Sequence, residues 1–129
     1  MKNLLRFSSS MLVVAMAASL SAQPPAPKTT DVLVMLTIKA GVDRSAMTKV
    51  MPSEVRDTVR LYLDGKIRQW FSRSDGKGVM FIVPATSVDE AKAIMETLPL
   101  SKANLADYEY IPLSPLAPLA ALLGPPPGK

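Results

Sequence analysis

Asp107 and Glu109, in the run Asp107-Tyr108-Glu109-Tyr110, are the residues best placed by type and spacing to do chemistry. Alternate side chains of a β-strand share a face, so the two carboxylates lie on one face and the two tyrosines on the other. If the tyrosines pack under helices, the carboxylates point into a pocket. A buried carboxylate with a raised pKa can take and return a proton next to a carbonyl. We predict Glu109, with Asp107, as the catalytic residues.

The absence of histidine and cysteine from the 129 residues limits the alternatives. Ser–His and Cys–His catalysis, zinc fingers and iron–sulfur clusters are excluded within this chain. The remaining acidic residues show no spacing typical of a calcium site. The turn Asp75-Gly76-Lys77-Gly78 lacks the Gly-Lys-Ser/Thr ending of a phosphate-binding loop. We therefore expect no metal and no cofactor.

Cations and one tryptophan are the candidate substrate-binding residues. A substrate carboxylate needs a cationic partner, for which Lys39, Arg68 and Arg73 are candidates, and Trp70 is suited to form the apolar floor of a pocket. Each residue also has a more ordinary interpretation. Glu109 and the arginines would then be solvated or ion-paired surface charges, and Trp70 a core or interface residue.

The N-terminal residues are typical of an export signal. Lys2 and Arg6 precede the apolar run 11–20, and small residues lead up to Gln23. This order predicts a signal peptide over residues 1–22, and therefore a periplasmic or secreted protein. A retained membrane anchor is the alternative, but the run is shorter than the ~20 residues that span a bilayer.

With the signal peptide, this interpretation divides the chain into four segments. A Pro-rich spacer covers residues 23–30, a domain residues 31–115 and a Pro-rich tail residues 116–129. The formal net charge is +4 and falls to +2 once Lys2 and Arg6 are removed. This charge is too small, and basic residues too scattered, to indicate a nucleic-acid partner.

The domain alternates strand and helix patterns in the order β-α-β-β-α-β. Strands are expected over residues 32–39, 67–73, 79–83 and 105–113, and helices over 44–63 and from the capping box Ser87–Glu90 to Pro99. In the first helix we expect a buried stripe at Met47, Met51, Val55, Val59 and Leu63, widened by Val50 and Tyr62. Pro52 predicts either a kink or a later helix start. The order is that of an α+β, ferredoxin-like fold with an antiparallel four-stranded sheet.

The first strand is apolar on both faces, so we expect neither face of the sheet to be open to water. Two helices cover one face, and a second copy of the chain is the simplest cover for the other. The sequence therefore predicts a homodimer, with a pocket between the sheet and the partner.

Residues 32–116, about two thirds of the chain, resemble the muconolactone isomerase-like family of dimeric α/β-barrel proteins. The resemblance rests on five features in order: the Trp70-bearing strand, the turn Asp75-Gly76, Ser87-Val88, Leu98-Pro99-Leu100, and the run Asp107-Tyr-Glu109-Tyr. It implies a ferredoxin-like dimeric barrel and a cofactor-free isomerase of a small lactone or organic acid. YCII-related domains share some of these features, but their characteristic histidine is absent here.

Two functions remain open. One is an exported isomerase that uses carboxylate proton transfer, with a pocket that holds Glu109 or Asp107 beside an arginine. The other is a non-catalytic binding or assembly domain, in which Trp70, Phe71 and leucines fill the space between two sheets. A cavity suited to a ligand would distinguish them.

Overall fold

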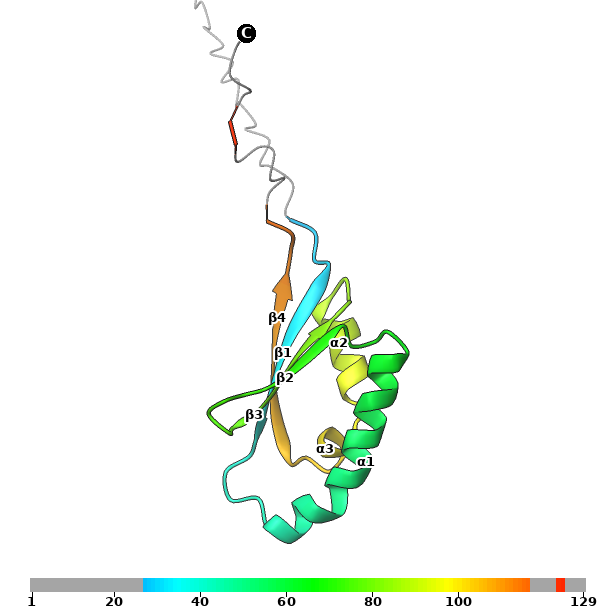
Figure 1. Ribbon diagram of the computed structural model, residues 1–129, viewed down its shortest axis with the longest axis vertical. Coiled ribbons are helices and arrows are strands. Elements are labelled where there is room, and N and C mark those ends of the chain that lie inside the picture. The colour runs from blue at the N-terminus through cyan, green and yellow to red at the C-terminus, as the bar shows by residue number, and fades with distance from the viewer. Residues whose placement is uncertain (1–26, 117–122, 125–129) are drawn as a thin grey trace, which may run out of the picture.

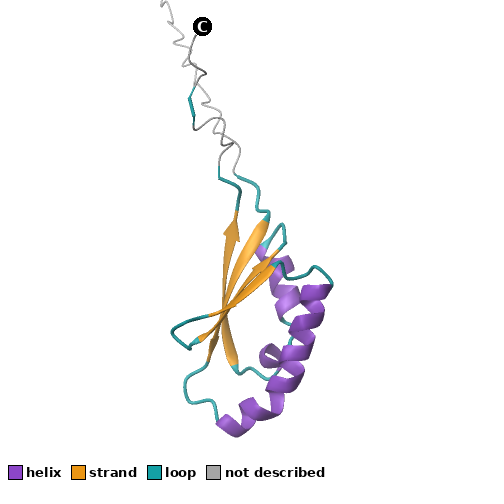
Figure 2. Cartoon of the chain, in the orientation of Figure 1, coloured by secondary structure: helices purple, strands orange, loops and turns teal. Residues whose placement is uncertain are grey.

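A computed structural model describes residues 27–116 and 123–124 of the chain. The predicted signal peptide and most of the predicted tail lie outside these residues. The described part is an α+β domain in which one antiparallel sheet is covered on one face by helices (Figures 1 and 2). The elements, in chain order, are β1 (Asp31–Ile38), α1 (Arg44–Leu63), β2 (Gln69–Ser72), β3 (Gly78–Val83), α2 (Val88–Met95), α3 (Pro99–Lys102) and β4 (Ala106–Leu113).

The four strands lie in the order β2-β3-β1-β4, and every neighbouring pair is antiparallel. This confirms the predicted α+β class and antiparallel sheet and is compatible with a ferredoxin-like fold. The predicted element order is also found, with the short helix α3 as an addition. β2 is shorter than the predicted strand, and β4, which contains Pro112, is an edge strand as proline requires.

The core lies between the sheet and the helices. Val34 is the central residue of this sheet face, since it pairs with Phe81 on one side and Tyr110 on the other. Alternate residues of β1 point the same way, and burying their side chains is the main stabilising contribution. The fully buried apolar side chains include Val32, Val34, Leu36, Val83, Met95 and Leu98.

Helix α1 is rotated relative to the expected stripe, which was wrong in its second half. Val55 and Leu63 are 51% and 75% exposed, whereas Glu54 and Thr58 are each only 5% exposed. A strict four-residue spacing advances about 40° per repeat around a helix of 3.6 residues per turn. Such a row therefore turns away from the sheet. The helix is continuous from Arg44 to Leu63 and includes Pro52, so it does not begin there.

The two helix starts differ in their capping. The Ser87 hydroxyl accepts a hydrogen bond from the Glu90 backbone N–H at 3.1 Å, which confirms the Ser87 half of the predicted capping box. The Glu90 carboxylate accepts from the N–H of Thr86, the residue before the cap, and not from that of Ser87. Asp43 stands at the start of α1 but makes no side-chain capping bond. Ser45 donates a hydrogen bond to its carboxylate instead.

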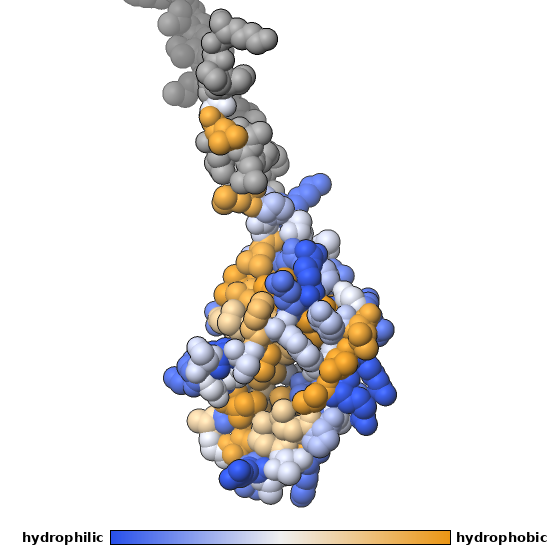
Figure 3. All heavy atoms as spheres, viewed as in Figure 1, coloured by the Kyte–Doolittle hydropathy of each residue, from blue (hydrophilic) through white to orange (hydrophobic). Residues whose placement is uncertain are grey.

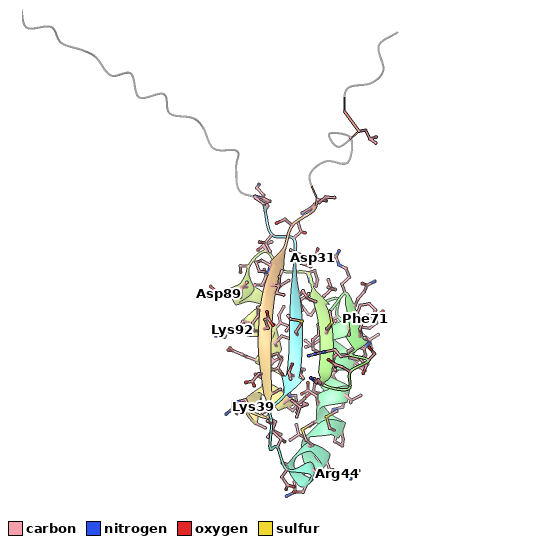
Figure 4. The ribbon with its side chains drawn as sticks, turned by 90° about the vertical axis from the view of Figure 1, so that its left-hand side faces the viewer. Asp31, Lys39, Arg44, Phe71, Asp89 and Lys92 are labelled. Carbon is pink, nitrogen blue, oxygen red and sulfur yellow. The ribbon has the colours of Figure 1, made fainter. Side chains whose placement is uncertain are left out.

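The second sheet face carries no helix among the described residues, and Figure 4 looks onto it. Pairing places apolar side chains from all four strands on this face, together with Asp107 near one end and Glu109 opposite Met35. We call it the open face; its apolar residues are Leu33, Met35, Phe71, Met80, Ile82, Ile111 and Leu113. Phe71 is 54% exposed there. A contiguous apolar surface of this kind is unusual on a sheet face that remains exposed to solvent.

Candidate functional site

The alternation expected on β4 is confirmed. Tyr108 and Tyr110 pack against the core and stack on each other with ring centroids 6.3 Å apart, while Asp107 and Glu109 are exposed on the open face. Burial, together with the charge of Glu54, raises the pKa of Tyr108. Its hydroxyl is buried and has no hydrogen-bond partner among the described residues.

Two of the predicted cations join the two carboxylates. Arg73, Asp107 and Glu109 line one hollow of about 310 Å³ on the open face. Lys39 lies beside it, with its ammonium 3.7 Å from the Asp107 carboxylate. Both cations already have partners, since Arg73 donates to Thr37 at 3.1 Å and pairs with Asp75, and Lys39 donates to Asn104. An anionic ligand would have to compete with these contacts.

The other two predicted residues lie elsewhere. Arg68 pairs with Asp31 at 3.1 Å, at the start of β1, whereas Lys39 follows its end, and Figure 4 shows Asp31 and Lys39 at opposite ends of the sheet. Trp70 pairs with Phe81 and so lies on the helix side of the sheet, where it stacks on Tyr62 with ring centroids 6.0 Å apart. The structure therefore does not place Trp70 beside Glu109.

Trp70 instead lines an apolar cavity between α1 and the sheet. The cavity has a volume of about 210 Å³. Its walls come from β1, α1, β2, β3 and α3, and its main lining residues are Leu36, Met47, Met51, Val55, Phe81 and Leu100. Val55 and Trp70 line the cavity and are also partly exposed, so its mouth lies between α1 and β2. For comparison, a dry apolar cavity of about 150 Å³ holds benzene.

Glu54 is the ionisable residue in this lining. Because the rest of its surroundings are apolar, burial raises the pKa of its carboxyl above the ordinary value, and the nearby charge of Asp57 raises it further. The hydrogen bond from the Leu100 backbone N–H to Glu54 Oε2, at 2.8 Å, acts in the opposite direction. That bond also satisfies a donor at the first turn of α3, which has no side-chain cap of its own.

Glu54 lines the cavity, and its second carboxyl oxygen is not held by the Leu100 N–H. Glu54 Oε1 accepts no hydrogen bond from the described residues. Thr58, one turn further along α1, adds a hydroxyl to the same wall. A carboxyl fixed through one oxygen, in an apolar cavity and with a raised pKa, has the properties of a general acid or base.

Sequence reasoning missed Glu54 because the expected stripe placed Val55 on the buried face. The signal was present: Met47, Val50, Met51, Glu54, Thr58 and Leu61 recur at the mixed three- and four-residue spacing of a helix face that stays against a sheet. A glutamate inside such a row is a buried carboxyl, and therefore a candidate for a shifted pKa.

The described residues contain no cluster of three or more metal-ligating side chains. None of the described helices is both long and apolar enough to cross a membrane. No protein-family model matches the chain, and no curated protein matches it.

Proposed function

We propose that this protein binds a small, neutral carbonyl compound in the cavity between α1 and the sheet, and isomerises it without a cofactor by proton transfer through Glu54. The substrate class is a small lactone, which agrees with the resemblance to the muconolactone isomerase-like family. The observation that carries the proposal is a single buried carboxyl with a raised pKa in a lining that is apolar apart from Thr58.

The proposed reaction moves one proton. In an unsaturated lactone, Glu54 Oε1, as carboxylate, takes a proton from the carbon next to the carbonyl, which leaves a conjugated enolate. The resulting carboxylic acid returns the proton to another carbon of that enolate. No proton is consumed overall, and no oxidant or reductant is needed. The Leu100 N–H holds Oε2 and so fixes the position of the carboxyl throughout.

The lining also favours one charge state of the ligand. The described residues that line the cavity include no lysine or arginine, and Glu54 would repel an anion when ionised. Placing a substrate carboxylate there without a cation would be costly. A lactone or a protonated acid is therefore favoured over an organic anion.

The open face supplies a second candidate. Asp107, Glu109 and Arg73 share one hollow there, and Lys39 pairs with Asp107. This set suits an organic anion better than the cavity does, provided that a second sheet covers it and excludes water. A third possibility is that the cavity binds a ligand without turning it over.

A homodimer is part of the proposal. The apolar residues of the open face favour pairing with the same face of a second copy, because such a C2 interface would bury them on both sides. We further propose that the protein is exported, on the order of charged, apolar and small residues within 1–22.

Matched carboxylate variants test the proposed site. Glu54→Gln keeps an oxygen that accepts the Leu100 N–H but cannot transfer a proton, and Glu109→Gln does the same on the open face. The native chain and the two variants, each of which replaces one carboxylate by an amide, are purified and screened for isomerisation of small lactones. We expect Glu54→Gln to lower kcat at least about 100-fold, within the usual range for a lost acid or base, and Glu109→Gln to retain it. The opposite pattern would assign the chemistry to the open face.

A further inference from the structure

A row of exposed apolar side chains runs along the second half of α1. Val55 and Val59 are 51% and 37% exposed, and Tyr62 and Leu63 are 45% and 75% exposed. Trp70 of β2 stacks on Tyr62 and extends the row across the mouth of the cavity. We call this surface the α1 ridge. Figure 3 shows apolar atoms that run along the helix beside hydrophilic ones.

Basic side chains follow the ridge on its outer side. At about 100° per residue, Lys49, Arg56 and Arg60 lie within about 40° of one another and next to the row formed by Val55 and Val59. All three are exposed. The neighbouring carboxylate is Asp57, which lies 3.4 Å from the Arg56 guanidinium and 3.2 Å from that of Arg60. Three cations therefore lie beside Asp57 and the C-cap carboxylate Asp64.

Helix α2 shows that this surface is not a general property of the fold. Its exposed positions include Asp89, Glu90 and Lys92, and the exposed Glu96 caps its C-terminus, so both signs of charge are present with no large apolar side chain. That is an ordinary solvated helix face. On α1, by contrast, an exposed apolar row, an aromatic pair and a basic row occur together.

From this combination we infer that the α1 ridge docks the protein on an anionic lipid surface. Apolar side chains enter the headgroup region, tyrosine and tryptophan suit the interface between lipid and water, and lysine and arginine pair with lipid phosphates. The ridge lies on the helix side of the sheet, so a homodimer formed through the open face would leave it exposed. Docking would bring the mouth of the cavity to the membrane. The inference does not depend on any reaction in that cavity.

Trp70 provides a direct readout because it is the only tryptophan in the chain. The full chain is titrated with vesicles of phosphatidylglycerol and phosphatidylcholine, and separately with phosphatidylcholine alone. We expect the anionic vesicles to shift Trp70 emission to shorter wavelength, brominated acyl chains to quench it, and added salt to weaken the effect. Absence of any anionic-vesicle effect on Trp70 would overturn the inference.

Substitutions on the α1 ridge test whether vesicle binding depends on this surface or on another part of the chain. Leu63→Asp and the double variant Arg56→Glu/Arg60→Glu are expected to weaken vesicle binding at least ~10-fold. Lys92→Glu on α2 removes a similarly exposed cation and should change binding less than ~2-fold. Circular dichroism checks that each variant is folded.

Two results would contradict docking through the ridge. Vesicle binding that survives Leu63→Asp would assign it to another segment, such as residues 1–22, which every variant retains. A protein that does not bind vesicles but loses a dimer on Leu63→Asp would show that a second copy covers the ridge.

Discussion

Glu54 has two roles at the residue scale that substitution can separate. Its carboxyl accepts the Leu100 N–H, which is a structural contact, and its ionisation is disfavoured by burial. Glu54→Ala leaves that N–H without its acceptor, and we expect a loss of about 1–3 kcal/mol in the free energy of unfolding. Glu54→Gln keeps an acceptor and should change stability much less. Equal losses for the two variants, measured by urea unfolding at pH 7, would contradict the structural role.

The pH dependence of stability follows from the direction of the Glu54 pKa shift. A carboxyl whose pKa is higher in the folded than in the unfolded state stabilises the fold below its ordinary pKa. That contribution is lost as pH rises through the folded-state value, at about 1.4 kcal/mol per unit of pKa difference.

The comparison that isolates this effect is between the native chain and Glu54→Gln, each unfolded at a series of pH values from 4 to 8. We expect the native chain to lose stability relative to the variant as pH rises. Asp43 and Asp75, whose pKa values are lowered by hydrogen bonds, act in the opposite direction but are common to both proteins. A difference that stays constant with pH would mean that Glu54 is not perturbed.

At the scale of elements, the close approach of β3 to β1 depends on Gly78. A Cβ at this position would lie 1.8 Å from the Leu36 carbonyl oxygen, which belongs to the backbone of the neighbouring strand. We expect Gly78→Ala to cost more than about 3 kcal/mol, since the strands would have to separate.

Gly76 in the β2–β3 turn is the matched control for Gly78. It has a φ of +70°, but a Cβ there would meet nothing within 4 Å. Gly76→Ala should therefore cost only the backbone strain, about 1–2 kcal/mol. Similar losses for both variants in thermal unfolding would argue against the close contact of β1 and β3.

Local patterns predicted the elements well because each depends on nearby residues. The capping of α2 by Ser87 and the alternation of Tyr108 with Glu109 are such features. The rotation of α1 depends instead on how a whole helix lies against the sheet, which a row of valines at four-residue spacing misrepresents. That single error hid Glu54 and also concealed the exposed ridge at Val55 and Leu63.

The predicted site residues lie in different places for a related reason, since their positions also depend on how the strands pair. Arg73, Asp107 and Glu109 came together because the antiparallel register places the end of β2 and the start of β4 at the same end of the sheet. Trp70 went to the opposite face, since the face of a strand residue is set by its partner and not by its type. The sequence gives β2 too few alternating residues to decide that face.

At the scale of the whole molecule, the open face makes the oligomeric state testable. Met35 lies near its centre, paired with Met80 on one side and Glu109 on the other. We expect light scattering to give the mass of a dimer for the native chain and of a monomer for Met80→Lys, because Met80 pairs with Met35 and Phe71 and a lysine there would be buried in the interface with no carboxylate directly opposite. Leu63→Lys, on the α1 ridge, is the control and should remain dimeric. A monomeric native chain would refute the proposed pairing.

Ligand-induced stabilisation tests most directly whether the cavity between α1 and the sheet binds a small neutral compound. A ligand at 100 times its Kd adds about 2.7 kcal/mol, which for a domain of this size raises Tm by about 10–20 °C. Thermal unfolding is followed for the native chain, for Val79→Phe, which fills the cavity, and for Ile82→Phe, which enlarges a side chain on the open face.

We expect at least one neutral lactone of a small panel to raise the Tm of the native chain and of Ile82→Phe, and to leave that of Val79→Phe unchanged. Stabilisation that persists in Val79→Phe, or none with any lactone, would contradict binding in this cavity.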